Sequence, residues 1–307
     1  MPTLRTRLTV SFVLGAASGL FCWYLMARLG QGAADFVWAI RAAEALLAGR
    51  NPYANAAQLY PLPAALFGLP FVRIRPEIAA GVFYGISSGL LAFGVTRGGY
   101  HRLLIFLAYP YWAGMLAAQW PTLIMASAFF PVLLPVTLAK PQAGLPVALI
   151  NISRRGVIAC LPVILLSFLV LPRWLSLWLA NVGEYPHFFP VMVLPGPLLA
   201  LGLLRYGDRD AWLLLSAACM PQRWFYDQFL LWLIPKTRRE IIYTAGLSWA
   251  AGIWRWYHGP PNLMQVGRWT VVGMYLPMLA VLLLRGRKRR RGPQLNAGSG
   301  GQGEGLG

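Results

Sequence analysis

Residues 8–28 read LTVSFVLGAASGLFCWYLMAR, a predominantly apolar run that is long enough to cross a lipid bilayer as one helix. Further apolar runs follow as far as residue 285. Together they predict an all-α fold, a polytopic helical bundle in a membrane. Asp35, the first acidic residue of the chain, lies at the first predicted exit from the membrane. A carboxylate is costly to place near lipid, so Asp35 is a candidate functional residue.

The composition agrees with a membrane protein. Of the 307 residues 58% are hydrophobic and only 12% are charged, which is too few to cover a water-facing surface. The formal net charge is +18, but the basic residues stand at the ends of apolar runs rather than on one polar domain, so nucleic acid is not an expected partner. Cys22, Cys160 and Cys219 have no paired spacing and no His neighbours, so neither a disulfide framework nor a zinc site is expected.

Candidate crossings can be counted along the chain. They cover residues 8–28, 61–72, 78–96, 103–118, 120–138, 141–152, 157–172, 188–204, 210–220, 224–235, 241–257 and 268–285. With the N-terminus inside, the cytoplasmic segments are MPTLRTR (1–7), RIRPE (73–77), ISRRG (152–156), RYGDRD (205–210), KTRRE (236–240) and RGRKRRR (285–291). This assignment puts most Lys and Arg inside, as the positive-inside rule expects.

The crossing count has a range because several runs are shorter than the usual 20 residues. We expect about 8–12 helices, some of them short or broken, in a single membrane domain of residues 1–291. The Gly-rich residues 292–307 are expected to form a disordered cytoplasmic tail, and the basic cluster 285–291 to lie against anionic lipid head groups. The predicted location is a prokaryotic plasma membrane, crossed many times, with both termini cytoplasmic.

Two outer segments are predicted to be helical. In residues 35–50, Phe36, Ile40, Ala43 and Leu47 recur at helical spacing, which predicts an amphipathic helix on the outer membrane surface. In residues 173–189 two Trp one turn apart and further aromatics are typical of an interfacial helix and loop.

The order of these features resembles a known family. A first helix is followed by DF, by a stretch ending in LLAGRNPY, and by YPLP; Gln119 and LAKPQAGLP (138–146) come later, and then PQRWFYDQ (221–228). This order resembles the family-87 glycosyltransferases of the GT-C superfamily, which use polyprenyl-phosphate sugars and many of which are mannosyltransferases. Where that family usually reads YPP and Gly-Gln, this chain has YPLP and AAQW, and Tyr226 and Asp227 stand where the family tends to have His.

The resemblance implies an inverting membrane glycosyltransferase. It would transfer a mannose-like hexose from a polyprenyl phosphate to a lipid-linked or periplasmic acceptor, with Asp35 as the general base. It implies no cofactor, and its partners would be the lipid-linked donor, a lipid or glycan acceptor and membrane lipids. Substrate-binding and donor-phosphate-binding residues are expected among Lys140, Arg223, Gln119, Asp227 and Tyr60.

The residues themselves fit this chemistry, although each has a simpler interpretation. The transfer needs a base for the acceptor hydroxyl and cations for the departing phosphate. Asp35 could instead cap the amphipathic helix or stabilise its dipole. Lys140 stands at the end of an apolar run, where it either meets an anion or extends its ammonium to the membrane surface. Asp227 could simply pair with Arg223 or Tyr226.

Other functions remain open at this stage. No GxxxxGK[ST], GxGxxG or GxSxG motif occurs, and the scattered His residues lack ligand spacing, so neither a nucleotide nor a metal is expected. A transporter or flippase would carry polar residues at the centres of its crossings, whereas the acids here gather at their ends. A non-catalytic relative of the family is the other alternative.

Overall fold

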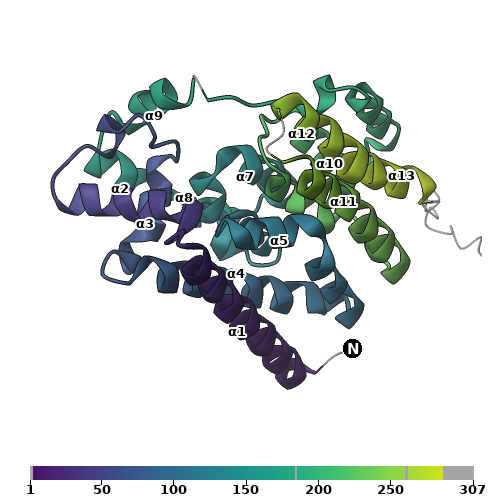
Figure 1. The fold of residues 1–307 in the computed structure, drawn as a ribbon, viewed down its shortest axis with the longest axis horizontal. Coiled ribbons are helices and arrows are strands. Elements are labelled where there is room, and N and C mark those ends of the chain that lie inside the picture. Colours follow the sequence, from purple (N-terminus) through teal and green to yellow (C-terminus); the bar gives the residue numbers. More distant parts are fainter. Residues whose placement is uncertain (1–2, 184, 260–261, 286–307) are drawn as a thin grey trace, which may run out of the picture.

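The structure, a computed structural model, describes residues 3–183, 185–259 and 262–285. These residues form helices joined by short loops, and their one β pairing is an isolated bridge between Phe188 and Gln222. The predicted all-α class is therefore confirmed for the described part of the chain. Figure 1 shows α2, α3 and α9 at one side of the molecule and α10 to α13 at the other.

Each predicted run is helical, and several are divided. The α-helices are α1 Leu4–Leu29, α2 Val37–Leu47, α3 Leu62–Gly68, α4 Pro76–Val95, α5 Tyr109–Leu116, α6 Pro121–Ser127, α7 Pro141–Asn151, α8 Arg154–Val170, α9 Trp174–Val182, α10 Arg209–Ala218, α11 Arg238–His258, α12 Leu263–Thr270 and α13 Leu276–Leu284. The 3-10 segments are η1 Ala34–Phe36, η2 Pro52–Ala54, η3 Leu69–Phe71, η4 Thr96–Gly98, η5 Tyr100–Leu107, η6 Pro131–Ala139, η7 Pro190–Met192, η8 Gly196–Arg205 and η9 Phe225–Leu233. A π-helical turn, η10 Val271–Tyr275, joins α12 to α13.

Three described helices are long and apolar enough to cross a membrane: Leu4–Leu29, Pro76–Gly98 and Leu263–Leu284. A fourth span results if α8 and α9, which bend by 91° at their junction, are taken together. These helices support a membrane protein. Of the shorter segments, η9 is buried over nearly its whole length, whereas only Gly196, Leu199 and Gly202 are buried in η8. Irregular backbone is tolerated at membrane depth where protein surrounds it.

Helices α1 and α4 pack in direct backbone contact and run antiparallel. A Cβ atom at Gly15 would lie 2.9 Å from the carbonyl oxygen of Gly85, so the close approach requires glycine there. Small residues at such contacts are typical of helix pairs in membranes. At the N-terminal end of α1, Arg7 donates to the carbonyl of Phe93 at 2.6 Å, and at the other end Gly32 lies against Pro76.

This packing corrects the predicted topology. RIRPE (73–77) lies at the end of the bundle opposite the N-terminus, and residues 97–102 lie at the N-terminal end, which is the reverse of the sequence prediction. The physical reason is the length of residues 62–71. These form only α3 and η3, and ten helical residues rise roughly 15 Å, about half of a hydrocarbon core. The chain therefore returns to the side it came from before α4 begins.

The predicted helix in residues 35–50 is present as η1 and α2, but its apolar face packs on protein rather than on the membrane surface. Phe36, Ile40 and Ala43 are buried in the protein. Leu47, predicted to share that face, is 68% exposed. The ring of Phe36 stacks on Phe83 with centroids 4.1 Å apart, so the start of the helix is anchored to α4.

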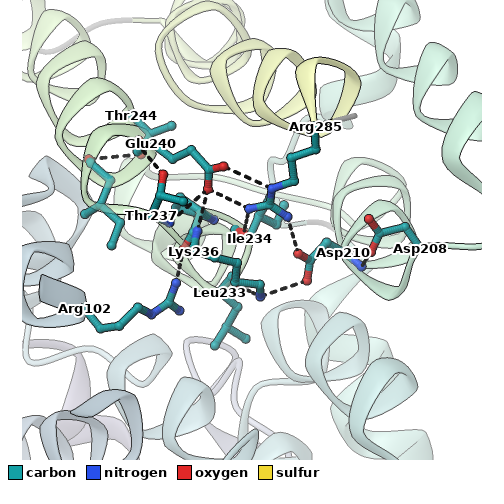
Figure 2. Close-up of polar contacts among 12 residues, drawn as sticks. Arg102, Asp208, Asp210, Leu233, Ile234, Lys236, Thr237, Glu240, Thr244 and Arg285 are labelled. Atoms are coloured by element: carbon teal, nitrogen blue, oxygen red, sulfur yellow. Dashed lines mark hydrogen bonds and ion pairs between the residues drawn. The ribbon is translucent and has the colours of Figure 1, made fainter. Parts of the chain in front are cut away.

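A polar network closes the N-terminal end of the bundle. Figure 2 shows Arg285 extending toward the carboxylates of Asp210 and Glu240. Its Nη1 lies 2.8 Å from Asp210 Oδ2, and its Nη2 lies 2.8 Å from Glu240 Oε2. Lys236 pairs with Asp210 at 3.1 Å, and Arg102 donates to the carbonyl of Pro235. Three predicted cytoplasmic loops thus meet at one place.

Arg285 also corrects one expectation, since its guanidinium binds protein carboxylates rather than lipid head groups. The rest of the basic cluster and the predicted tail 292–307 lie outside the described residues.

Candidate functional site

The predicted site residues converge at the end of the bundle opposite that network. A cavity of about 360 Å³ is lined by Asp35, Tyr60, Lys140, Arg223 and Asp227, among others. Gln119, the remaining predicted residue, is fully buried and hydrogen-bonded to Asp35 and Lys140. The residues come from η1, the loop before α3, the α5–α6 turn, the η6–α7 junction, the loop leading into η9, and η9 itself.

The Asp35 carboxylate does not cap a helix. Neither η1 nor α2 has a side-chain hydrogen bond at its N-terminus, so the capping interpretation is wrong. Asp35 does lie in the first turn of η1, so its interpretation as a carboxylate that stabilises the helix dipole stays a prediction. Instead Oδ2 accepts hydrogen bonds from Gln119 Nε2 and from the hydroxyl of Tyr226, the latter at 3.2 Å. Oδ1 accepts none from the described residues, so it is available to a ligand in the cavity.

The backbone on both sides of this contact is strained. Ala34 has φ +44° and Ala118 has φ +45°, a left-handed conformation that costs a non-glycine residue roughly 1–2 kcal/mol. The two strained residues directly precede Asp35 and Gln119. The amide of Asp35 donates to the carbonyl of Ala117 at 3.1 Å, which ties the two segments together. Such strain persists only where surrounding structure imposes it, and it is concentrated at functional sites.

Lys140 is buried and paired, so the expectation that its ammonium simply extends to the membrane surface is wrong. The residue is 4% exposed, and Nζ lies 2.7 Å from Gln119 Oε1 and 2.5 Å from Asp227 Oδ1. It also lies 4.8 Å from the centre of the Tyr226 ring. Lys140 stands between η6 and α7, where Pro141 begins the next helix. The apolar run therefore ends inside the protein and not at its surface.

Gln119 links the Asp35 carboxylate to the Lys140 ammonium because its amide has both a hydrogen-bond donor and an acceptor. Its NH₂ group donates to the Asp35 carboxylate while its carbonyl oxygen accepts from the Lys140 ammonium, which fixes the orientation of the amide. Contacts therefore run without a break from Asp35 through Gln119 and Lys140 to Asp227. With both carboxylates and the ammonium ionised, this network holds two negative charges and one positive charge.

Asp227 and Arg223 do not pair with each other as the simpler interpretation proposed. Asp227 binds Lys140, while the Arg223 guanidinium lies over the ring of Tyr185, 4.2 Å from its centre, and 5.6 Å from that of Trp224. Burial raises the pKa of the Tyr185 hydroxyl, and the positive charge of Arg223 opposes that effect. Arg223 has no carboxylate partner among the described residues, so its charge is open to an anion in the cavity.

Tyr226, Tyr185 and Gln222 line the cavity but were not predicted as site residues. Tyr226 and Gln222 lie in PQRWFYDQ, the segment already singled out, and their proximity to Asp227 was the available signal. Tyr185 is one of the aromatic residues of segment 173–189, which was interpreted as an interfacial helix and loop and not as part of the site.

Helix α9 holds the outer loop that forms one wall of the cavity. The indole of Trp178 donates to the carbonyl of Leu59 at 2.9 Å, and Tyr53 donates to the carbonyl of Tyr60 at 3.2 Å. The predicted interfacial aromatic segment is therefore a helix, but Trp174 is buried against protein. Its role in the structure is to fix the loop that carries Tyr60.

No protein-family model, curated protein or solved structure matches this chain. Within residues 3–183, 185–259 and 262–285 no three His, Cys, Asp or Glu side chains are placed to hold one metal ion. The expectation that no metal is needed stays a prediction. The function is argued below from the geometry of the cavity.

Proposed function

We propose that this protein is an integral-membrane glycosyltransferase that transfers a hexose from a polyprenyl phosphate to an acceptor hydroxyl, with Asp35 as the general base. One observation carries the proposal. The Asp35 carboxylate is held by Gln119 and Tyr226 on one oxygen while the other faces a cavity with no donor from the described residues. A positioned carboxylate with a free oxygen is what proton removal from a hydroxyl requires.

The reaction balances with the residues present. The acceptor oxygen forms a bond to the anomeric carbon and gives its proton to Asp35 Oδ1. The bond from the anomeric carbon to the phosphate oxygen breaks, and polyprenyl phosphate leaves with the electron pair. Attack opposite to the leaving group inverts the anomeric configuration. Developing negative charge on the phosphate is stabilised by a nearby cation, and Arg223 lines the cavity without a carboxylate partner among the described residues.

Lys140 has a different part in this mechanism from the one predicted. Its charge is already opposed by Asp227 at 2.5 Å. It fixes Gln119, which in turn fixes Asp35, and its ammonium contributes to the field in the cavity. Its contribution to phosphate binding is therefore secondary to that of Arg223.

Two further features support the assignment. The cavity volume of about 360 Å³ falls in the range of small-molecule sites. Ala118 stands where the family-87 enzymes usually have Gly, and its φ of +45° is a conformation that glycine adopts without strain. A Gly at this position would therefore fit the observed backbone.

The orientation in the membrane follows from charge. The N-terminus and most of the described basic loops share one end of the bundle, and the cavity lies at the other. By the positive-inside rule the basic end is cytoplasmic and the cavity opens outside, in the plasma membrane of a prokaryote.

The test is direct transfer. Purified protein is incubated with labelled polyprenyl-phosphate hexoses and a membrane lipid extract, and product is resolved by chromatography. The proposal expects a labelled product whose anomeric configuration is inverted. Labelled donor that crosses reconstituted vesicles without transfer would instead identify a flippase, and retention of configuration would exclude the mechanism.

A further inference from the structure

A second cavity adjoins the first and is not used by the proposed chemistry. It measures about 850 Å³ and lies between α2 and the loop of residues 50–58. Trp38 lines both cavities, so the two cavities are neighbours. Trp38 follows Asp35 by three positions, about one helical turn. A ligand in the second cavity therefore lies beside the site that contains the proposed base.

The second cavity is rich in hydrogen-bond donors. Arg41 and Arg50 both line it, and neither has a carboxylate partner among the described residues. The Arg41 guanidinium lies 5.3 Å from the centre of the Trp38 ring. Glu44 also lines the cavity and makes no ion pair within the described residues. Two guanidinium groups and one carboxylate leave a net positive charge.

Gln58 provides an independent sign of a ligand. It is 3% exposed and lines the cavity, yet its Nε2 group has no hydrogen-bond partner within the described part of the chain. A buried amide without a partner is unfavourable, and such groups in proteins are nearly always satisfied. An acceptor atom of a bound molecule would satisfy it.

The loop of residues 50–58, which carries Arg50 and Gln58, is held in place by hydrogen bonds within the protein. Asn51 Oδ1 accepts from the amide of Tyr53 at 3.0 Å, and Asn55 Oδ1 accepts from the amide of Ala57 at 3.0 Å. Asn181 of α9 donates to the carbonyl of Gln58 at 3.3 Å. Because Asn51 and Asn55 use their oxygen atoms in this way, their NH₂ groups remain as donors.

We propose that this second cavity binds the acceptor, and that the acceptor is a polyhydroxylated molecule with a phosphate group. Guanidinium and amide donors suit phosphate and hydroxyl oxygens, and the Glu44 carboxylate suits a hydroxyl donor. The name acceptor rests on the proposed function, whereas the binding of a phosphate-bearing polyol does not. The phosphate belongs either to a phospholipid head group or to a soluble ester, and the experiment separates the two.

The experiment measures binding by isothermal titration with detergent-solubilised protein. The probes are dioctanoyl phosphatidylglycerol, the neutral dioctanoyl glucosylglycerol, and sn-glycerol 3-phosphate. The variants are the double change Arg41→Gln/Arg50→Gln and the single change Gln58→Met. Arg173→Gln is the control, because Arg173 is exposed and lies outside both cavities.

The double variant is expected to raise the Kd for phosphatidylglycerol by at least about tenfold, and Gln58→Met by about threefold or more, while Arg173→Gln leaves it unchanged. The neutral lipid should bind more weakly to wild type. If sn-glycerol 3-phosphate binds as tightly as the lipid, the ligand is a soluble ester, and if it binds far more weakly, the ligand is a lipid head group. Equal affinity for the charged and neutral lipids, or no loss in the double variant, would overturn the proposal.

Failure of this inference can be told apart from failure of the proposed function. Asp35→Asn should retain the Kd for phosphatidylglycerol, since Asp35 does not line the second cavity. In the transfer assay the arginine variants should raise the KM for the acceptor and leave the KM for the donor unchanged. Selective binding without any transfer would refute the glycosyltransferase and leave the anion site standing.

Discussion

Lys140→Met is the sharpest test of the contacts that link Asp35 to Asp227, because it removes one member of a buried ion pair. Lys140 is 4% exposed and Asp227 is 3% exposed, and their charged atoms are 2.5 Å apart. At an effective dielectric constant of about 20, unit charges at that distance attract by about 7 kcal/mol. Desolvation cancels much of this attraction, and loss of one partner of a buried pair typically costs about 3–5 kcal/mol.

We therefore expect Lys140→Met to lower the free energy of unfolding by about 3–5 kcal/mol, or the Tm by about 5–8 °C for a chain of this length. The second change Asp227→Asn removes the stranded carboxylate, so the double variant should recover at least about 2 kcal/mol. Thermal unfolding in detergent, followed by intrinsic fluorescence, measures both effects.

Lys236→Met is the matched control for this measurement. Lys236 also pairs with an aspartate, Asp210, at 3.1 Å, but its side chain is 52% exposed. An exposed pair contributes less than about 1 kcal/mol. The reasoning is refuted if Lys140→Met costs no more than the control, or if the double variant is no more stable than Lys140→Met alone.

Three further predictions concern the backbone, the pH dependence and the topology. Ala118 has φ +45°, so Ala118→Gly should leave the free energy of unfolding unchanged or raise it by up to about 1 kcal/mol, while Ala118→Val should lower it by more than that. Equal free energies of unfolding for the two variants would show that the backbone at Ala118 is not strained. Burial would raise the pKa of Glu240, but hydrogen bonds from Arg285 and from the backbone outweigh it and lower the pKa from its usual 4.5 to about 2. The wild type should therefore exceed Glu240→Gln by about 1–2 kcal/mol above pH 5 and lose that advantage as the pH falls through 4.5 toward 2; an advantage that grows in acid would exclude this role. Cysteines introduced at Asn55 and at Ile74 should both react with an impermeant thiol reagent from outside intact cells, because residues 62–71 do not cross the membrane and positions 55 and 74 lie on the same side. Labelling of only one of them would show that residues 62–71 do cross.

Hydropathy alone predicted the helical segments, because the hydropathy of a run and its tendency to form a helix are both local properties of the sequence. The runs at 141–152 and 241–257 coincide with α7 and α11 to within a few residues. The side of the membrane on which a loop lies is not a local property, because its prediction assumes that every preceding apolar run crosses the membrane. Residues 62–71 are apolar but too short to cross, and one such segment inverts the side of every residue until another compensates. That is why RIRPE (73–77) was placed at the wrong end.

The members of the candidate site could be predicted but their partners could not. Asp35, Lys140, Arg223 and Asp227 were selected because charged residues near membrane exits are rare and costly. Gln119 and Tyr60 came from the resemblance to the glycosyltransferase family. Lys140 and Asp227 are 87 positions apart in the sequence, and a periodic pattern predicts only contacts between residues close in sequence. The left-handed backbone at Ala34 and Ala118 was equally hidden, since alanine gives no signal for it. The resemblance to a glycosyltransferase family predicts roles for these residues, and those roles await measurement.

The central claim is that Asp35 removes the proton from the acceptor hydroxyl. The measurement that tests it most directly is the transfer rate of Asp35→Asn, which keeps the shape of the side chain and removes its basic oxygen. Asp208→Asn is the control, since Asp208 lies at the opposite end of the bundle and its Oδ1 caps α10 in a way that Asn can reproduce. We predict that Asp35→Asn lowers kcat by about a hundredfold or more while folding and the control are unaffected. Transfer by Asp35→Asn at a rate near that of the wild type would contradict the mechanism.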